Sequence, residues 1–205
     1  MFLELWIWLC IIVVLFAALA IGWYAWWFKR RRFLKKRSEL NGQARITAQQ
    51  KGLNIDKVFV VNDHLTFDKT DEAIKPQFFI DTASRKMVFI DYDKPLTIVA
   101  DFSEFLNYEI YENGSMAFCG GGAGGLLAGG FWGETVGKCN NLRLIVRLKR
   151  YECPQMTYDI IAKTPLNLGV VKTSRAYQKC VSSMQELASF FEVIKHESEE
   201  RENKE

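Results

Sequence analysis

The stretch QFFIDTASRKMVFIDYDKPLTIVADFSEFLNYEIY, residues 77–111, decides the fold of the part of this chain that is not uniformly apolar. Short apolar runs in it are separated by residues that favour turns, such as Ser84-Arg85-Lys86 and Asp93-Lys94-Pro95. Apolar runs of this length between turns are typical of short strands. We expect antiparallel strands on a meander, at residues 77–81, 87–91, 96–101 and 107–111.

The same pattern continues on both sides of this stretch. A strand is expected before it, at Val58 to Val61. After it, the sequence LRLIVRLK at residues 142–149 alternates most clearly, because its leucines and Val146 face one way and its basic residues mostly face the other. Residues 156–162 supply a seventh strand.

An amphipathic helix is expected to begin near Ser174. Its apolar residues recur on one face, at Tyr177, Cys180, Val181, Met184, Leu187, Ala188, Phe191 and Ile194. Seven short strands and a closing helix are the element order of a pleckstrin-homology-like (PH-like) fold, in which the helix plugs the open end of two orthogonal sheets. An α+β meander with the helix across one sheet would show the same pattern. We expect an α+β chain with a PH-like antiparallel β domain at residues 57–195, closed by this helix and followed by a charged tail, residues 196–205, that frays into solvent.

The N-terminal segment has a different character, because residues 5–28 contain no charged side chain. A helix of these 24 residues, at about 1.5 Å each, reaches roughly 36 Å and can cross a hydrocarbon core of about 30 Å. Tryptophans gather at both of its ends, where indole rings can face headgroups. A signal peptide cleaved at Ala18-Leu19-Ala20 is the alternative, but no basic segment precedes the apolar run. We predict a transmembrane anchor at residues 1–28.

A cationic stretch, KRRRFLKKR at residues 29–37, follows the apolar run, whereas the N-terminal flank carries only Glu4. The positive-inside rule then predicts that the N-terminus lies outside the cell and the C-terminal domain in the cytoplasm. The cations either set this topology alone or also contact anionic lipid headgroups. They are Lys29, Arg30, Arg31, Arg32, Lys35, Lys36 and Arg37. Residues 29–56 are expected to form a basic linker and a short helix that Gly52 ends.

A second group of cations belongs to the strand at residues 142–149. Arg143 and Arg147 are expected on its outer face, where they could contact lipid or an acidic partner. The alternative is a solvated sheet surface with no ligand.

A glycine-rich insertion is expected at residues 114–137, within which glycine recurs at every fourth position, at Gly121, Gly125, Gly129, Gly133 and Gly137. In a helix these glycines would line one groove, as in segments that pack closely in lipid or against a second copy. A flexible β-hairpin loop entered through Asn113-Gly114 is the alternative. The segment also matches a dinucleotide-binding glycine pattern by letter, but no β-α-β unit surrounds it.

The chain resembles an uncharacterised group of bacterial PH-like proteins, which often carry a short C-terminal helical module. The resemblance covers roughly the last two thirds of the chain and rests on QFFID, KMVFID, EFLNYEIYENG, the glycine-rich insertion, NNLRLIVRLKR and the closing helix. It implies a PH-like fold and a binding role, and no functional residue carries over from it. This sequence departs from the group by its N-terminal anchor and by lacking the short module.

Other functional classes are disfavoured by composition. A net charge of +3 is too small to indicate nucleic acid binding. Five cysteines without a C-x-x-C pair and only two histidines predict neither a metal site nor a cofactor. Cys119, Cys139 or Cys153 with His64 have no spacing typical of a nucleophile and base, so we do not expect an enzyme.

These observations favour a membrane-tethered cytoplasmic binding or adaptor module. We expect it to self-associate and to contact a membrane protein partner or anionic lipid. The alternative is a small membrane-perturbing or pore-type effector, for example in phage defence or exclusion, that uses the glycine-rich insertion. A conduction path usually supplies ionisable side chains, and residues 5–28 contain none.

Overall fold

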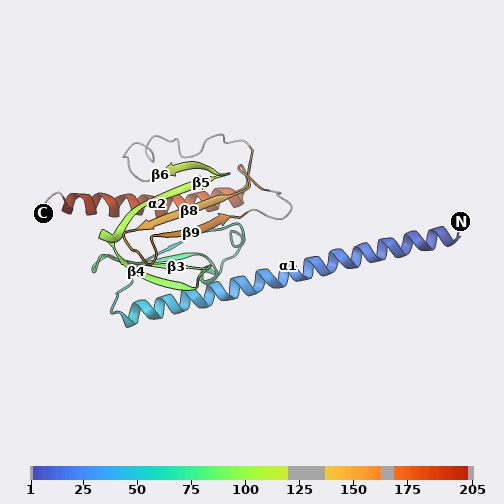
Figure 1. Ribbon diagram of the computed structural model, residues 1–205, viewed down its shortest axis with the longest axis horizontal. Coiled ribbons are helices and arrows are strands. Elements are labelled where there is room, and N and C mark those ends of the chain that lie inside the picture. Colours follow the sequence, from blue (N-terminus) through green and yellow to red (C-terminus); the bar gives the residue numbers. More distant parts are fainter. Residues whose placement is uncertain (1, 120–136, 163–168, 203–205) are drawn as a thin grey trace.

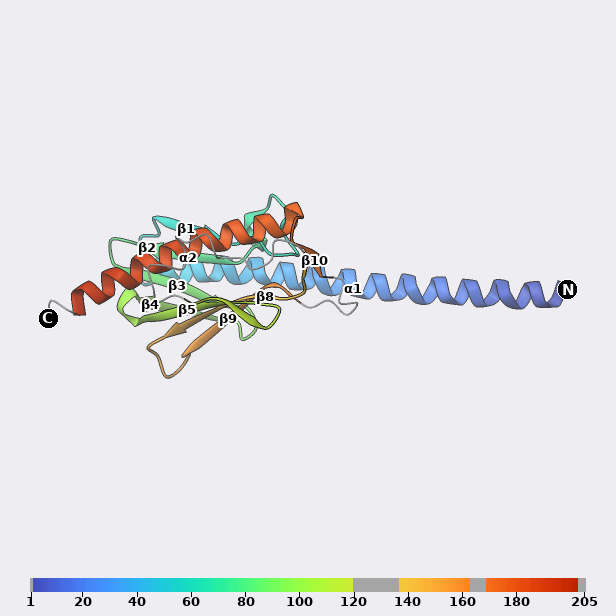
Figure 2. The same cartoon turned by 90° about the horizontal axis from the view of Figure 1, so that it is seen from above.

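The computed structural model describes residues 2–119, 137–162 and 169–202, and the protein is α+β. A long helix, α1 (Phe2–Gln50), leads into two four-stranded antiparallel sheets and a C-terminal helix, α2 (Arg175–Glu202). Figures 1 and 2 show the sheets and α2 gathered beside the C-terminal half of α1, while its N-terminal half projects away from them.

The first sheet is formed by four consecutive strands in the order β1-β2-β3-β4, so the predicted meander is confirmed for this sheet. Its strands are Lys57–Val60, Gln77–Asp81, Lys86–Asp91 and Leu96–Asp101. The connection between β1 and β2, residues 61–76, contains a short 3-10 helix, η1 (Glu72–Ile74), and is called the β1–β2 loop below.

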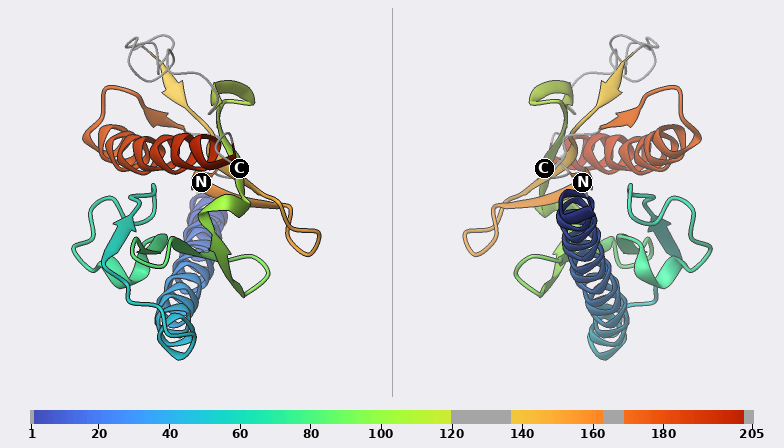
Figure 3. Two further views of the ribbon diagram at one scale, coloured as in Figure 1. Left: turned by 90° about the vertical axis from the view of Figure 1, so that its left-hand side faces the viewer. Right: turned by 90° about the vertical axis from the view of Figure 1, so that its right-hand side faces the viewer.

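Both faces of the first sheet are covered. Phe79 and Ile90 pack with Ala44 of α1 in one apolar cluster, whereas Phe78 and Phe89 point into the main core on the opposite face. Side chains alternate between the two faces along a strand, and β2 and β3 each contain a run of consecutive apolar residues. Both faces of these strands therefore present apolar side chains that must be covered. Figure 3, along the long axis, shows α1 and α2 on different sides of the domain.

The second sheet has the order β6-β5-β8-β9, in which the three predicted strands are neighbours and β6 is added at the edge beside β5. A 3-10 helix, η2 (Phe102–Glu104), connects the first sheet to the second. The strands of the second sheet are β5 (Phe105–Glu112), β6 (Ser115–Cys119), β8 (Leu142–Leu148) and β9 (Gln155–Ile161). The unexpected strand is β6, which pairs with β5 through a two-residue turn at Asn113 (φ 52) and Gly114 (φ 87). Two short strands, β7 (Lys138–Cys139) and β10 (Val170–Val171), pair with each other.

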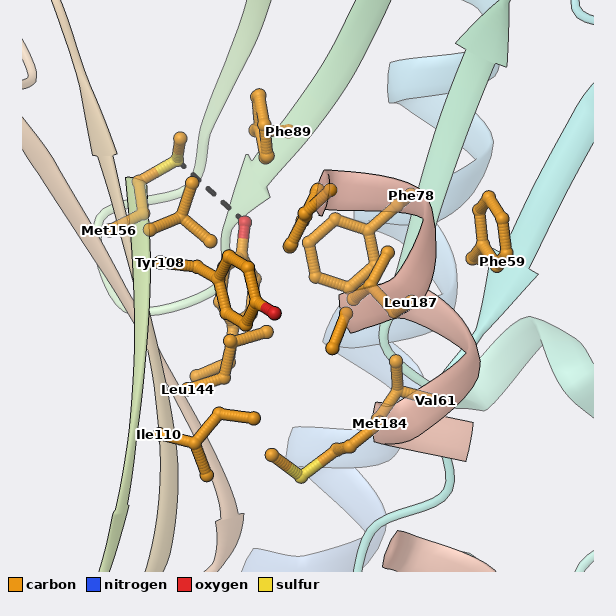
Figure 4. Close-up of a cluster of buried hydrophobic side chains, with 14 of the residues drawn as sticks. Phe59, Val61, Phe78, Phe89, Tyr108, Ile110, Leu144, Met156, Met184 and Leu187 are labelled. Atoms are coloured by element: carbon orange, nitrogen blue, oxygen red, sulfur yellow. Dashed lines mark hydrogen bonds between the residues drawn. The ribbon is translucent and has the colours of Figure 1, made fainter. Parts of the chain in front are cut away.

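Helix α2 fills the space between the two sheets. All eight positions predicted for its apolar face, from Tyr177 to Ile194, are buried. Phe191 contacts rings of both sheets, with centroid distances of 6.2 Å to Phe78 and 4.9 Å to Phe105. Figure 4 shows Met184 and Leu187 of α2 beside core side chains of both sheets. The closing helix is therefore part of the main core.

The C-terminal end of α2 differs from the prediction of a fraying tail. The helix continues to Glu202, well beyond Ile194. Arg85 Nη1 lies 2.7 Å from Glu197 Oε2, and Ser198 Oγ donates to the carbonyl of Phe102 at 3.3 Å. These contacts with the β2–β3 turn and with η2 hold Glu197 and Ser198 against the domain.

A linker was expected after the apolar run, but helix α1 is continuous. Its 49 residues run without a break from the apolar half, residues 5–28, through the cationic stretch, residues 29–37. It is long and apolar enough to cross a membrane. Its end is confirmed at Gly52 (φ 73), whose N–H bonds Gln49 O while Leu53 N–H bonds Ala48 O. This is a Schellman motif, and the buried contact between Leu53 and Ala48 accompanies it.

Candidate functional site

The cationic stretch lies where α1 leaves its free apolar half and reaches the domain. Lys29, Arg31 and Arg32 are exposed, as are Lys35 and Lys36. The guanidinium of Arg31 lies 3.9 Å from the ring centre of Trp27, and that of Arg32 lies 4.3 Å from Phe28. These side chains therefore fold back toward the aromatic end of the apolar half.

Arg30 and Arg37 have a different role, because they face the domain. Arg30 is half-buried, and its Nη2 donates to the carbonyl of Leu65 at 2.5 Å. Arg37 is only 5% exposed, and its Nη1 lies 2.5 Å from the Asp63 carboxylate. Both join α1 to the β1–β2 loop, so we leave Arg37 out of any lipid contact.

The buried ion pair is enclosed by further polar and aromatic groups. Asp63 also accepts from Thr66 Oγ1 at 2.5 Å and from Leu65 N at 3.2 Å. The Arg37 guanidinium lies 4.6 Å from the Phe33 ring centre and 5.2 Å from that of Tyr92. The hydrogen bonds to the Asp63 carboxylate reduce the cost of burying this charge pair.

A second polar contact lies one turn further along α1. Asn41 Nδ2 donates to Ala73 O at 2.7 Å and Lys75 O at 2.8 Å, and its Oδ1 accepts from the Tyr92 hydroxyl at 2.7 Å. That hydroxyl in turn accepts from Gln77 N at 2.9 Å. Burial raises the pKa of Tyr92 well above its ordinary value, so the phenol stays a neutral donor.

A cavity of about 230 Å³, called the α1 cavity here, opens between α1, the β1–β2 loop and β9. The residues that line it are Phe33, Arg37, His64, Leu65, Pro76, Tyr92, Asp93, Thr157, Tyr158, Asp159 and Ala162. A second hollow of about 220 Å³, called the outer hollow, is lined by Trp26, Lys29, Arg30, Phe33 and Leu65. The two share Phe33 and Leu65, so they lie next to each other along α1.

One hydrogen-bonding group of a residue that lines the α1 cavity is unsatisfied. Arg37 Nε is buried and has no hydrogen-bond partner among the residues that the structure describes. His64 anchors the opposite wall, with its Nδ1 3.1 Å from the carbonyl of Ile160. Because Arg37 Nε itself is buried, this donor lies behind the wall of the cavity and does not face its space.

The second predicted group of cations is paired with carboxylates on the outer face of the second sheet. Arg143 Nε lies 2.7 Å from Asp159 Oδ1, beside the α1 cavity. Arg147 forms a bidentate pair with Glu109 at 3.1 Å for both contacts. These arginines are therefore part of cross-strand ion pairs, and only Arg143 lies close to the cavity.

The glycine prediction falls mostly outside the described residues. Gly121, Gly125, Gly129 and Gly133 belong to residues 120–136, on which the structure gives no description. Gly137 has φ 123 and precedes β7, and its carbonyl accepts from Lys172 N.

Three cysteines of the domain, Cys139, Cys153 and Cys180, are poor nucleophiles because they are buried. Burial raises the pKa of both Cys139 and Cys180 to about 12, and it also raises the pKa of Cys153. Within the described ranges, no group of three His, Cys, Asp or Glu side chains could hold a metal ion.

No protein-family model matches this chain, and comparisons with the curated proteins and with the solved structures likewise gave no match. Its function is therefore argued from the geometry above.

The buried contacts of α1 with the β1–β2 loop were not predicted from the sequence. Arg37 looks like the last of seven similar cations, and Asp63 is 26 residues away. One signal was available. Phe33, Arg37, Leu40, Asn41 and Ala44 recur at spacings of three and four, which places them on one helix face.

Proposed function

We propose that this protein is a single-pass membrane-anchored binding module whose α+β domain lies at the cytoplasmic surface and contacts anionic lipid. The observation that carries the proposal is the continuity of α1. Because one helix contains the apolar half, the cationic stretch and the half that packs on the first sheet, the domain cannot move far from the surface at which the apolar half ends.

The exposed surface of the apolar half supports a membrane location. Large apolar side chains there, such as Phe16, Leu19 and Ile21, are each about 70% exposed. Soluble proteins rarely leave a patch of this size in water, and a hydrocarbon core would cover it. The cations directly after it favour an external N-terminus and a cytoplasmic domain.

A PH-like architecture is our interpretation of the domain. A four-stranded meander, a second antiparallel sheet and a helix between them support it. The second sheet departs from that pattern by its strand order, and α1 adds a layer to the first sheet. The interpretation favours a binding role over catalysis, in keeping with the poor nucleophilicity of the described thiols in the domain. Self-association through the glycine-rich insertion and contact with a membrane protein partner remain predictions.

The lipid contact is tested on the full-length protein in liposomes that contain trace spin-labelled lipids. Electron paramagnetic resonance then measures the association of each lipid relative to phosphatidylcholine. We expect preference for anionic headgroups, and we expect Arg31→Gln with Arg32→Gln to reduce it by about fivefold per charge at low salt, since each cation near the surface contributes about 1 kcal/mol.

The matched control replaces Arg45 and Lys51 by glutamine. Both side chains are exposed and lie beyond the cationic stretch, Arg45 within α1 and Lys51 directly after it, so the same charge is removed farther from the surface. An equal loss in both double variants would mean that net charge alone determines the preference. Wild-type protein with no anionic preference would contradict the proposed lipid contact.

A further inference from the structure

We propose that the α1 cavity binds the neutral polyhydroxyl headgroup of an anionic phospholipid, of which phosphatidylglycerol is the simplest. The lipid phosphate would lie in the outer hollow beside Lys29 and Arg30. This inference rests on the proposed function, because it needs the domain to lie at a membrane surface. The exposed cations alone would attract any anionic lipid, whereas this site would recognise one kind of headgroup.

The position of the two hollows selects a lipid as the ligand. Arg30 lies two positions after Phe28, the last residue of the apolar half, which is about 3 Å along a helix. Its hydrogen bond to Leu65 O holds the β1–β2 loop at this level. The outer hollow, which includes Trp26, therefore opens at the proposed headgroup level, and the α1 cavity lies next to it on the side away from the membrane.

The charges select where the phosphate lies. Lys29 and Arg30 are the cations that line the outer hollow. In the α1 cavity the Arg37 charge is paired with Asp63 and the Asp159 charge with Arg143, so the Asp93 carboxylate adds a negative charge. An anionic group is thus favoured at the outer hollow and disfavoured deeper, which matches a phosphodiester followed by an uncharged headgroup.

The hydrogen-bonding groups of the α1 cavity select hydroxyls. Thr157 brings a hydroxyl to the cavity wall, and a hydroxyl can both donate and accept. The Asp93 carboxylate can only accept when ionised, whereas Asp159 Oδ1 already lies 2.7 Å from Arg143 Nε. A ligand hydroxyl can donate to Asp93 and bond Thr157, whereas a ligand carboxylate would face the like charge of Asp93.

The size of the cavity agrees with a headgroup rather than a whole lipid. Its volume of about 230 Å³ lies below the range of roughly 300–1,000 Å³ that drug-sized ligands occupy. The acyl chains would remain in the bilayer beside the apolar half of α1.

The test compares phosphatidylglycerol with phosphatidylserine, which carry the same net charge near pH 7 but differ in headgroup chemistry. Full-length protein in liposomes with trace spin-labelled lipids gives the relative association of each. We expect phosphatidylglycerol to be preferred by about fivefold, the effect of one net hydrogen bond. Asp93→Ala and, separately, Thr157→Val should each lower this ratio toward one, because they remove hydrogen-bonding groups from the cavity wall.

The matched control is Glu186→Ala, which removes one negative charge from an exposed position on α2 and should keep the fivefold ratio. Asp93 and Thr157 are also exposed, so we expect all three variants to melt close to the wild type.

The outcomes separate this inference from the proposed function. Equal association of the two anionic lipids, both above phosphatidylcholine, would overturn the polyol site and leave the lipid contact standing. A phosphatidylglycerol preference that survives both cavity variants would place its origin elsewhere and also overturn the site. Displacement of the lipid by millimolar soluble glycerophosphoglycerol would make the ligand a soluble polyol phosphate. Absence of any anionic preference would reject the proposed function itself.

Discussion

At the scale of single residues, the ion pair between Arg37 and Asp63 contrasts in its burial with the pair between Arg143 and Asp159. Arg37 is 5% exposed and Asp63 is fully buried, whereas the side chains of Arg143 and Asp159 are each more than 40% exposed. Removing one partner of a buried pair leaves an uncompensated charge, while an exposed pair is already solvated. Two ion pairs with similar nitrogen–oxygen distances are therefore expected to contribute very differently to the free energy of unfolding.

We expect Asp63→Ala to lower the free energy of unfolding by about 3–5 kcal/mol, because Arg37 would stay buried without its counter-charge. The control, Asp159→Ala, should cost less than about 1 kcal/mol. Urea unfolding of the full-length protein in detergent micelles measures both. A double variant, Arg37→Met with Asp63→Ala, should recover part of the loss, and equal effects of the two single variants would contradict this account.

At the scale of elements, the sequence predicted most strands and the face of α2 but missed how α1 joins the domain. β2 and β4 begin and end where the pattern placed them, since turn residues flank apolar runs. β6 was missed because it leads into a glycine-rich segment without clear alternation. The continuity of α1 was missed because charged residues resemble a linker. In fact Leu40, Ala44 and Ala48 are buried on the helix face that packs against the first sheet.

The two glycines near the end of α1 should respond in opposite ways to alanine. Gly52→Ala places a side chain at φ 73, where only glycine is unstrained, and should cost about 1 kcal/mol of stability. Gly42→Ala lies inside the helix, and a Cβ there would meet open space. It should stabilise the protein by up to about 1 kcal/mol. Thermal unfolding followed by circular dichroism measures both, and shifts of the same sign would contradict the assignment of the helix end.

At the scale of the whole molecule, the C-terminal half of α1 belongs to the domain rather than to the anchor. It covers the outer face of the first sheet, including Phe79, Val88 and Ile90. The expected boundary between a linker at residues 29–56 and a domain that begins at residue 57 therefore divides one packed unit. The apolar half, in contrast, contributes none of the buried residues described for the domain.

Two truncations follow from this division. A chain that lacks residues 1–28 should fold without detergent and melt within a few degrees of the full-length protein. A chain that lacks residues 1–50 should lose several kcal/mol of stability or aggregate, because it exposes the sheet face that Leu40, Ala44 and Ala48 cover. Circular dichroism and size-exclusion chromatography compare them. Equal stability of the two truncated chains would show that this layer is dispensable.

Because α1 is one continuous helix, the domain is expected to change its orientation together with the apolar half. From Phe28 to Gln50 the helix extends 22 residues, or about 33 Å, beyond the apolar half. Transmembrane helices are tilted by about 20° on average, and an apolar stretch longer than the bilayer is thick can tilt further to stay covered. On the proposed placement, such a tilt displaces the far end of α1 sideways by about 11 Å. The orientation of the sheets should then follow bilayer thickness. Polarised infrared spectroscopy of oriented bilayers measures the angle between the sheets and the bilayer normal, and the same angle in thin and thick bilayers would refute this coupling.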